Sequence, residues 1–124
     1  MDDTLNSKKG FIYWGKALEA VQEAKGLNSV VLDLEGKCSW ADYMIIVTAT
    51  SRMHLRGIQM KVLDMLRDDE NLVLRNNKNT KNEDQWILMD CGGLVIQIMT
   101  AEAREYYDLE GVWFESESLF REEA

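Results

Sequence analysis

The chain has 124 residues, of which 46% are hydrophobic and 29% are charged, and this length and composition suffice for a single core and argue against wholesale disorder. Fourteen basic and 22 acidic residues give a formal net charge of −8, a balance that disfavours extensive contact with nucleic-acid phosphates. The acidity either keeps the chain soluble or favours a basic protein partner, and composition leaves both explanations open. We expect one domain over residues 1–124, with a core at about 11–114 and an acidic tail at 115–124.

The first expected helix covers residues 11–24, where apolar side chains recur at helical spacing and Gly26 follows as a terminator. Residues 30–34 and 43–47 are then two continuously apolar, β-branched runs on either side of a turn at 36–39. Runs of this kind predict strands that are buried on both faces.

A second helix is expected from residue 52 to residue 67, with Thr50 or Ser51 as its N-cap and an apolar stripe along one face. A brief strand at 72–74 follows. The next segment, 76–84, is polar and rich in asparagine, which predicts a hairpin loop or a linker within the domain.

Two further strands are expected at residues 86–90 and 94–99, joined by a tight turn at Gly92-Gly93 whose glycines suit positive φ values. Short helical pieces are expected at 102–107 and 109–114. The order α-β-β-α-β-β-β-α predicts the α+β (mixed α/β) class, as one domain with a mixed sheet of about five strands and helices on one face.

That arrangement leaves one face of the sheet to be explained. Strands that are apolar on both faces need cover on both, and two long helices cover only one. The other face, to which alternate side chains of residues 86–90 point, is either an interaction site or a surface closed by the C-terminal helices. Both alternatives remain open from the sequence.

The cysteines, Cys38 and Cys91, form no CxxC motif and have no companion histidines, so we expect reduced thiols, no metal site and no cofactor. No apolar run approaches the ~20 residues that span a bilayer, so no membrane contact is expected. The acidic start, Met1-Asp2-Asp3, differs from a signal or transit peptide. This favours a cytosolic protein, or an organellar protein without its presequence.

The sequence contains no catalytic constellation. His54 is the only histidine, and its place in the first turn of the second helix is more typical of packing or hydrogen bonding than of a general base. There is no P-loop or GxGxxG motif, and Asp33, Asp42 and Asp90 come from separate regions without the Asp-x-Asp spacing that holds magnesium beside a phosphate. We therefore expect that the chain is not an enzyme.

Trp86 begins an expected strand directly after the polar segment. Tryptophan is enriched at interface hot spots, but it is also a common core or sheet-edge aromatic with its indole N–H satisfied locally, and the residues alone favour the core. Tyr106, Tyr107 and Trp113 form a helical aromatic cluster, which is more often core than contact surface.

Three segments in order carry a resemblance to a known family: residues 39–54, 86–93 and 104–113. Together they resemble the Iojap/RsfS family of ribosomal silencing factors, and the similarity covers roughly residues 11–114. The matching pieces are Val31-Leu32-Asp33, Asp42-Tyr43, Thr50-Ser51-Arg52 with His54, Trp86, Asp90-Cys91-Gly92, Arg104, Tyr107-Asp108-Leu109-Glu110 and Trp113.

The chain also departs from the family pattern. Ala49 stands where the family usually has glycine, which predicts a turn with ordinary negative φ. Gly93 replaces a usual aspartate and Gln97 a usual histidine. If these two positions belong to the family's contact surface, the contact surface of this chain differs from that of the family. The resemblance implies a nucleotidyltransferase-like fold without the active site, because Ala49-Thr50-Ser51 is not followed by the acidic pair that those enzymes use.

The resemblance implies a protein that docks on the fourteenth-numbered protein of the large ribosomal subunit and blocks joining of the small subunit, with little direct RNA contact. Strand alternation and the family match together suggest the contact residues. Trp86 is the expected anchor, Leu88 the adjacent apolar contact and Asp90 a carboxylate for a basic partner residue. The full expected set is Trp86, Leu88, Asp90 and Gln97, with Tyr43 and Asp42 in support.

Other functions compete with this expectation. One is a nucleotide-binding, nucleotidyltransferase-like domain, and another is a self-associating module that forms a homodimer when free. The resemblance also leaves open starvation silencing in a bacterial cytoplasm or large-subunit assembly in the mitochondrial matrix or a plastid. The tail fits either a frayed terminus or a short helix that docks on another assembly factor through Leu119 and Phe120.

Overall fold

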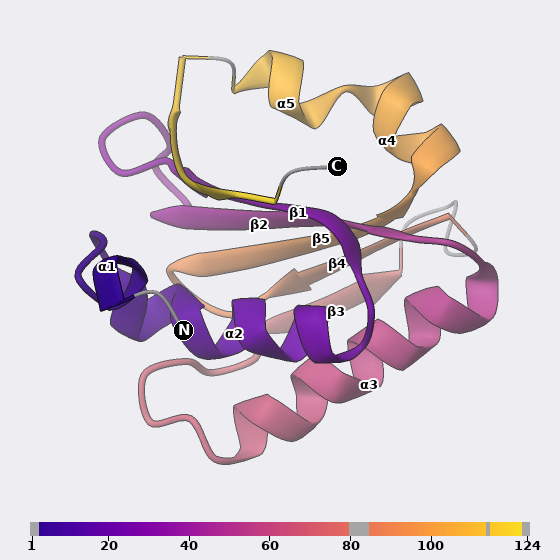
Figure 1. Cartoon of the computed structure of the whole chain (residues 1–124), viewed down its shortest axis with the longest axis horizontal. Coiled ribbons are helices and arrows are strands. Elements are labelled where there is room, and N and C mark those ends of the chain that lie inside the picture. Colours follow the sequence, from indigo (N-terminus) through magenta and orange to yellow (C-terminus); the bar gives the residue numbers. More distant parts are fainter. Residues whose placement is uncertain (1–2, 80–84, 114, 123–124) are drawn as a thin grey trace.

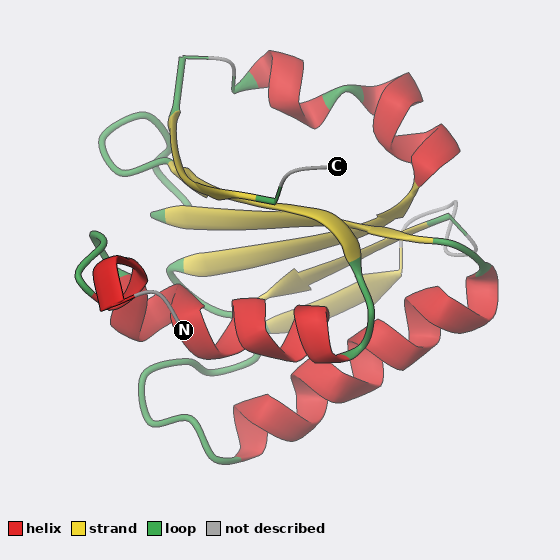
Figure 2. Cartoon of the chain, viewed as in Figure 1, coloured by secondary structure: helices red, strands yellow, loops and turns green. Residues whose placement is uncertain are grey.

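A mixed six-stranded sheet forms the centre of the molecule, with helices on both faces (Figures 1 and 2). The computed structural model describes residues 3–79, 85–113 and 115–122. The helices are α1 (Asp3–Asn6), α2 (Phe11–Glu23), α3 (Arg52–Arg67), α4 (Ala101–Tyr107) and α5 (Leu109–Val112). The strands are β1 (Leu27–Asp33), β2 (Tyr43–Ala49), β3 (Asn76–Asn79), β4 (Trp86–Asp90), β5 (Leu94–Thr100) and β6 (Glu117–Arg121). The predicted α+β class is therefore confirmed.

The strand order is β3-β4-β5-β2-β1-β6, so the two most apolar strands lie at the centre. β2 and β5 pair in parallel, from Tyr43 opposite Leu94 to Ala49 opposite Thr100. The other neighbours pair antiparallel. Every residue of β2 is buried, as expected for a strand covered on both sides.

The first face of the sheet is covered by α2 and α3, which lie side by side below it in Figure 1. Trp14 and Val21 of α2 and Ile58 of α3 are fully buried there against alternate side chains of the central strands. The indole N–H of Trp14 donates to the carbonyl oxygen of Lys9 at 2.8 Å, so its burial leaves no polar atom unsatisfied. Both long helices form where the apolar spacing predicts them.

His54 ties the start of α3 to the end of α2. Its Nδ1 accepts from the backbone N–H of Thr50 at 2.9 Å, so the proton is on Nε2, which lies 2.8 Å from the carbonyl oxygen of Ala24. Its own backbone N–H donates to Oγ of Ser51, the N-cap of the helix. The expected hydrogen-bonding role of this histidine is confirmed.

We expect His54→Ala to lower the free energy of unfolding by about 1–2 kcal/mol, because two ring hydrogen bonds are lost and the Thr50 N–H loses its acceptor. Urea denaturation measures this difference. The neighbouring Met53 is 84% exposed, so Met53→Ala is a matched control that should change stability little. Equal effects of the two substitutions would contradict the structural role of the ring.

The second face is covered by α4 and α5, above the sheet in Figure 1. This corrects the expectation of helices on one face only, and it favours closure by the C-terminal helices. The residues buried between these layers are Val30, Leu32, Leu34, Ala41, Met44, Ile46, Val95, Met99 and Ala103. Tyr107, Leu109 and Trp113 are partly buried against them. Two members of the predicted aromatic cluster, Tyr107 and Trp113, thus pack against the core.

Residues 117–121 of the acidic tail are neither helical nor frayed: they form β6, which pairs antiparallel with β1. Leu119 is buried in the first-face core and Phe120 packs against it. The backbone N–H of Glu122 donates to the carbonyl of Ser29 at 2.9 Å, which continues the pairing. β6 raises the strand number to six, one more than expected.

The strand expected at residues 72–74 is not formed. Leu72 is buried in the first-face core, but Val73 points to solvent with 71% exposure. Pairing with β4 begins only at Arg75, whose N–H donates to the carbonyl oxygen of Asp90, and continues as β3. Part of the segment expected to be a loop, 76–84, is therefore a strand, and residues 80–84 lie outside the described residues.

Candidate partner-binding surface

Alternation along β4 places Trp86, Leu88 and Asp90 on the second face, because Ile87 and Met89 are buried in the first-face core. Gln97 of β5 lies directly opposite Leu88 in the antiparallel register. Four of the six predicted contact residues therefore share one face of the sheet. We call the set Trp86, Leu88, Asp90 and Gln97 the β4–β5 surface.

Trp86 is held rigidly in this surface. Its indole N–H donates to Oε1 of the buried Gln97 at 2.6 Å, and its ring packs on Tyr107 of α4 with centroids 4.6 Å apart. The side chain is nevertheless only partly buried. Trp86 is therefore fixed in one orientation by its hydrogen bond to Gln97 and is still partly accessible to a partner. A pre-organised aromatic side chain of this kind can anchor an interface at low entropic cost.

Gln97 supports Trp86 from the neighbouring strand. Its side-chain oxygen is the acceptor for the Trp86 indole, and at 3% exposure it makes little direct surface. Leu88 beside it is partly exposed. Gln97 is therefore a positioning residue for Trp86, while Trp86 and Leu88 supply the accessible apolar area.

Asp90 ends β4 at the turn to β5. One oxygen of its carboxylate accepts from the N–H of Gly92 at 3.1 Å, and Gly92 has φ of 88°, which a side chain would disfavour. The positive φ expected in this turn is therefore found at Gly92. Asp90 is partly buried, and it sets the turn geometry at the edge of the β4–β5 surface.

Of the two supporting residues, Tyr43 does not join this surface, whereas Asp42 lies near its edge. Tyr43 points to the opposite face, where it is 5% exposed and its ring stacks on Tyr13 of α2 with centroids 6.3 Å apart. Burial raises the pKa of its hydroxyl above the ordinary value. Asp42 is exposed at the start of β2, near the β4–β5 turn: a Cβ added at Gly93 would lie 3.2 Å from its carboxylate. The supporting role of Tyr43 is thus confined to the core.

The residues beside Trp86 that the sequence did not assign to the surface are Tyr106 and Tyr107 of α4. The two rings meet edge to face with centroids 4.9 Å apart. Tyr107 is partly buried between Trp86 and the core, whereas Tyr106 is 80% exposed. The helical spacing predicted an aromatic cluster, but it could not show which ring faces solvent.

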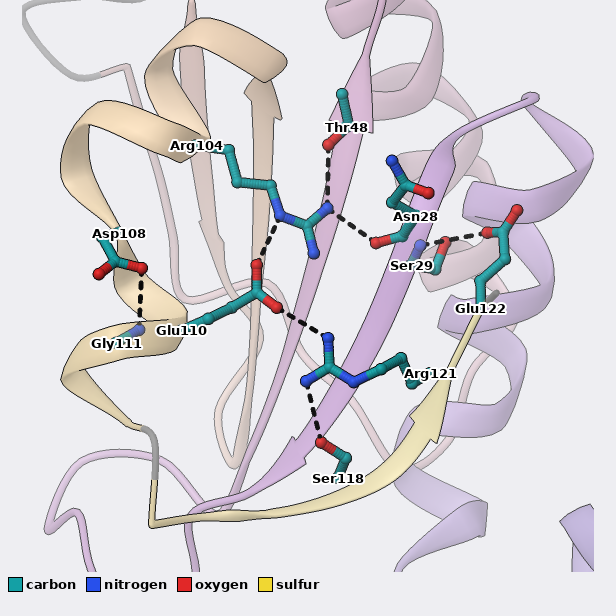
Figure 3. A network of polar contacts seen from close by, with 10 residues as sticks. All are labelled: Asn28, Ser29, Thr48, Arg104, Asp108, Glu110, Gly111, Ser118, Arg121 and Glu122. Carbon is teal, nitrogen blue, oxygen red and sulfur yellow. Dashed lines mark hydrogen bonds and ion pairs between the residues drawn. The ribbon is translucent and has the colours of Figure 1, made fainter. Parts of the chain in front are cut away.

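An ionic network holds α4 and α5 on the sheet (Figure 3). The Arg104 guanidinium donates to Oε1 of Glu110 at 2.9 Å, to the carbonyl oxygen of Asn28 at 2.7 Å and to Oγ1 of Thr48 at 2.9 Å. Arg121 of β6 donates to the other Glu110 oxygen at 3.0 Å. The network joins α4 and α5 to β1, β2 and β6, and so fixes the helix that carries Tyr107.

Glu110 makes part of this network depend on pH. Burial raises the pKa of its carboxyl, but hydrogen bonds from Arg104 and Arg121 outweigh burial, and the pKa lies below the ordinary value. The folded chain therefore binds this proton less tightly than the unfolded chain, whose glutamate pKa is about 4.3. The stabilisation is present above that pH and is lost as the pH falls through the folded pKa.

We therefore expect the free energy of unfolding of the natural chain to exceed that of Glu110→Gln most at neutral pH, with a difference that shrinks as the pH falls below about 4. Urea titrations at several pH values measure the difference. Glu19→Gln changes an exposed carboxylate on α2 and serves as control. A difference independent of pH would show that Glu110 acts only through packing.

Within ranges 3–79, 85–113 and 115–122, no group of three or more His, Cys, Asp or Glu side chains is placed to hold a metal ion. Burial, together with nearby Asp90 and Asp69, raises the pKa of the Cys91 thiol to about 12, so its reactive thiolate form is rare at neutral pH. Across the same ranges, none of the helices has the length and apolar character to cross a membrane.

Comparison with known proteins agrees with this fold. The family model described as "Ribosomal silencing factor during starvation" (RsfS) matches residues 13–124. The ribosomal silencing factor RsfS of Haemophilus influenzae is 32% identical over 104 residues, covering 77% of this chain and 92% of that protein. The mouse protein "Mitochondrial assembly of ribosomal large subunit protein 1" is 31% identical over 87 residues, covering 67% of this chain and 37% of that protein.

A crystal structure of a protein from Chromobacterium violaceum has the same fold, with a TM-score of 0.74, 26% identity and coverage of 81% of this chain and 82% of that one. The family model spans nearly the whole chain, including β6. The order of the signatures, the fold and the sequence match therefore agree, and the chain belongs to the RsfS (Iojap) family of ribosomal silencing factors.

Proposed function

We propose that this chain binds the large ribosomal subunit through the β4–β5 surface and thereby blocks joining of the small subunit. The observation that carries the proposal is Trp86, an aromatic side chain that is partly exposed and held in one orientation by Gln97 and Tyr107. Family membership and the name of the mouse relative support the large subunit as the target. The fourteenth-numbered protein of that subunit is the proposed docking site.

The electrostatics suit a basic ribosomal protein better than RNA. The net charge of −8 attracts a positively charged protein patch and repels phosphates. Complementary charge speeds encounter, whereas the buried area around Trp86 and Leu88 slows release. The proposed mechanism is competition for a surface, and it needs no chemical step.

The proposed binding activity has a different consequence in each of two cellular contexts. In a bacterial cytoplasm it would silence translation during starvation, and in a mitochondrion or plastid it would accompany large-subunit assembly, where other assembly factors share the subunit. Nucleotide binding and self-association are the competing functions, and no contact among the described residues favours either.

Sucrose-gradient sedimentation of a lysate tests the proposal. We expect the chain to co-sediment with free large subunits and to be depleted from intact ribosomes, because the docked chain excludes the small subunit. Its absence from every ribosomal fraction, in growing and in starved cells, would contradict the proposal. A shift in melting temperature with nucleotide and magnesium would then favour the competing function.

A further inference from the structure

A hollow of about 320 Å³ adjoins the β4–β5 surface on the α4 side. Its lining residues are Gln85, Glu102, Ala103, Tyr106 and Tyr107. Ala103 is buried and small, so its side chain fills little of this hollow. The size fits one long side chain of a partner.

The aromatic lining is continuous with the anchor of the β4–β5 surface. Trp86 contacts Tyr107, and Tyr107 contacts Tyr106. Tyr106 is 80% exposed, and tyrosine is enriched at interfaces because it combines an apolar ring with a polar hydroxyl. A partner that covers Trp86 therefore reaches Tyr106 without a gap.

Among the described residues, the charged side chain that lines the hollow is acidic. Glu102 lines it, and Glu105 is exposed on the same short helix. The nearest cation of that helix, Arg104, is directed to Glu110, Thr48 and the Asn28 carbonyl, away from the hollow. A carboxylate beside aromatic faces is the environment that a Lys or Arg side chain prefers.

We propose that this hollow receives one Lys or Arg side chain of the basic protein on which the chain docks, with Tyr106 as a cation–π platform and Glu102 as its counter-charge. The inference rests on the proposed function and adds to it the residues that select a cationic partner group. Charge complementarity and continuity with the β4–β5 surface identify the occupant. An RNA phosphate does not fit, because it would face Glu102.

The test measures the affinity of purified variants for isolated large subunits by co-sedimentation. We expect Tyr106→Ala to weaken binding about tenfold and Tyr106→Phe to retain it, because phenylalanine keeps the aromatic face. Glu102→Lys should weaken binding at least about tenfold through like-charge repulsion. The controls, Met53→Ala and Glu19→Lys, change exposed residues on the helices of the opposite face and should bind like the natural chain.

The outcomes separate this inference from the proposed function. If Tyr106→Ala and Glu102→Lys bind with the affinity of the natural chain while Trp86→Ala loses binding, the proposed role of the hollow is contradicted. The proposed role of the β4–β5 surface would still hold. Equal weakening by Glu102→Lys and Glu19→Lys would also contradict the proposed role of the hollow, because only net charge would then matter. If the natural chain does not bind large subunits at all, both proposals fail. Glu102→Gln replaces Glu102→Lys if thermal unfolding shows that the lysine variant is misfolded.

Discussion

Trp86→Ala is expected to weaken binding to isolated large ribosomal subunits by roughly 30-fold or more, a loss of about 2 kcal/mol, because a central aromatic anchor is removed. The indole is fixed by Gln97 and Tyr107 before any partner arrives, so little entropy is lost when it is covered. Fluorescence or sedimentation titration with purified subunits measures the change.

The effect on binding must be separated from an effect on folding. Trp86→Ala leaves the buried Gln97 oxygen without its indole donor, which we expect to cost about 1 kcal/mol of stability. Titrations are therefore made well below the melting temperature. Trp86→Phe keeps an aromatic ring against Tyr107 and should bind with intermediate affinity. Undiminished binding by a folded Trp86→Ala would remove the main support for the docking surface.

Arg104→Met is expected to lower the free energy of unfolding by about 2–3 kcal/mol, since charge-assisted hydrogen bonds are lost from a largely buried guanidinium. The Arg104 side chain is only 12% exposed, and its three acceptors come from three different elements. Methionine keeps much of the length and packing of the aliphatic stem. Urea denaturation at neutral pH measures the loss.

Arg67→Met is the matched control, because Arg67 is 74% exposed in an ion pair with Asp64 on the surface of α3. Such exposed pairs contribute little, and we expect a change below about 0.5 kcal/mol. If Arg104→Met were equally mild, the network would not be what holds α4 and α5 on the sheet. We also expect Arg104→Met to weaken subunit binding, because Tyr107 on α4 supports Trp86.

Elements with a strong internal pattern were predictable from the sequence. α3 and β4 begin and end at the predicted residues, because helical spacing with a Ser51 cap and a strand beginning at Trp86 are local signals. The tail was not predictable in the same way. Residues 117–121 are polar except for Leu119 and Phe120, and they become a strand only because β1 offers an open edge.

The sequence predicted which residues of a single strand share a face, but it did not predict which residues of different strands lie together. Alternation along β4 placed Trp86, Leu88 and Asp90 together. Whether Tyr43 shares their face depends on the register across β5, which pairs Ile46, not Tyr43, with Gln97. Pairing partners are tertiary information that no single strand carries. For the same reason, the sequence did not predict that Tyr106 is exposed, because this depends on how α4 packs on the sheet.

The most direct test of the proposed function is light scattering during association of purified large and small ribosomal subunits. We expect increasing amounts of the natural chain to reduce the amount of intact ribosome that forms, with Trp86→Ala much less effective and Met53→Ala as effective as the natural chain. Subunit joining that proceeds unchanged while the natural chain is bound to the large subunit would contradict the steric mechanism.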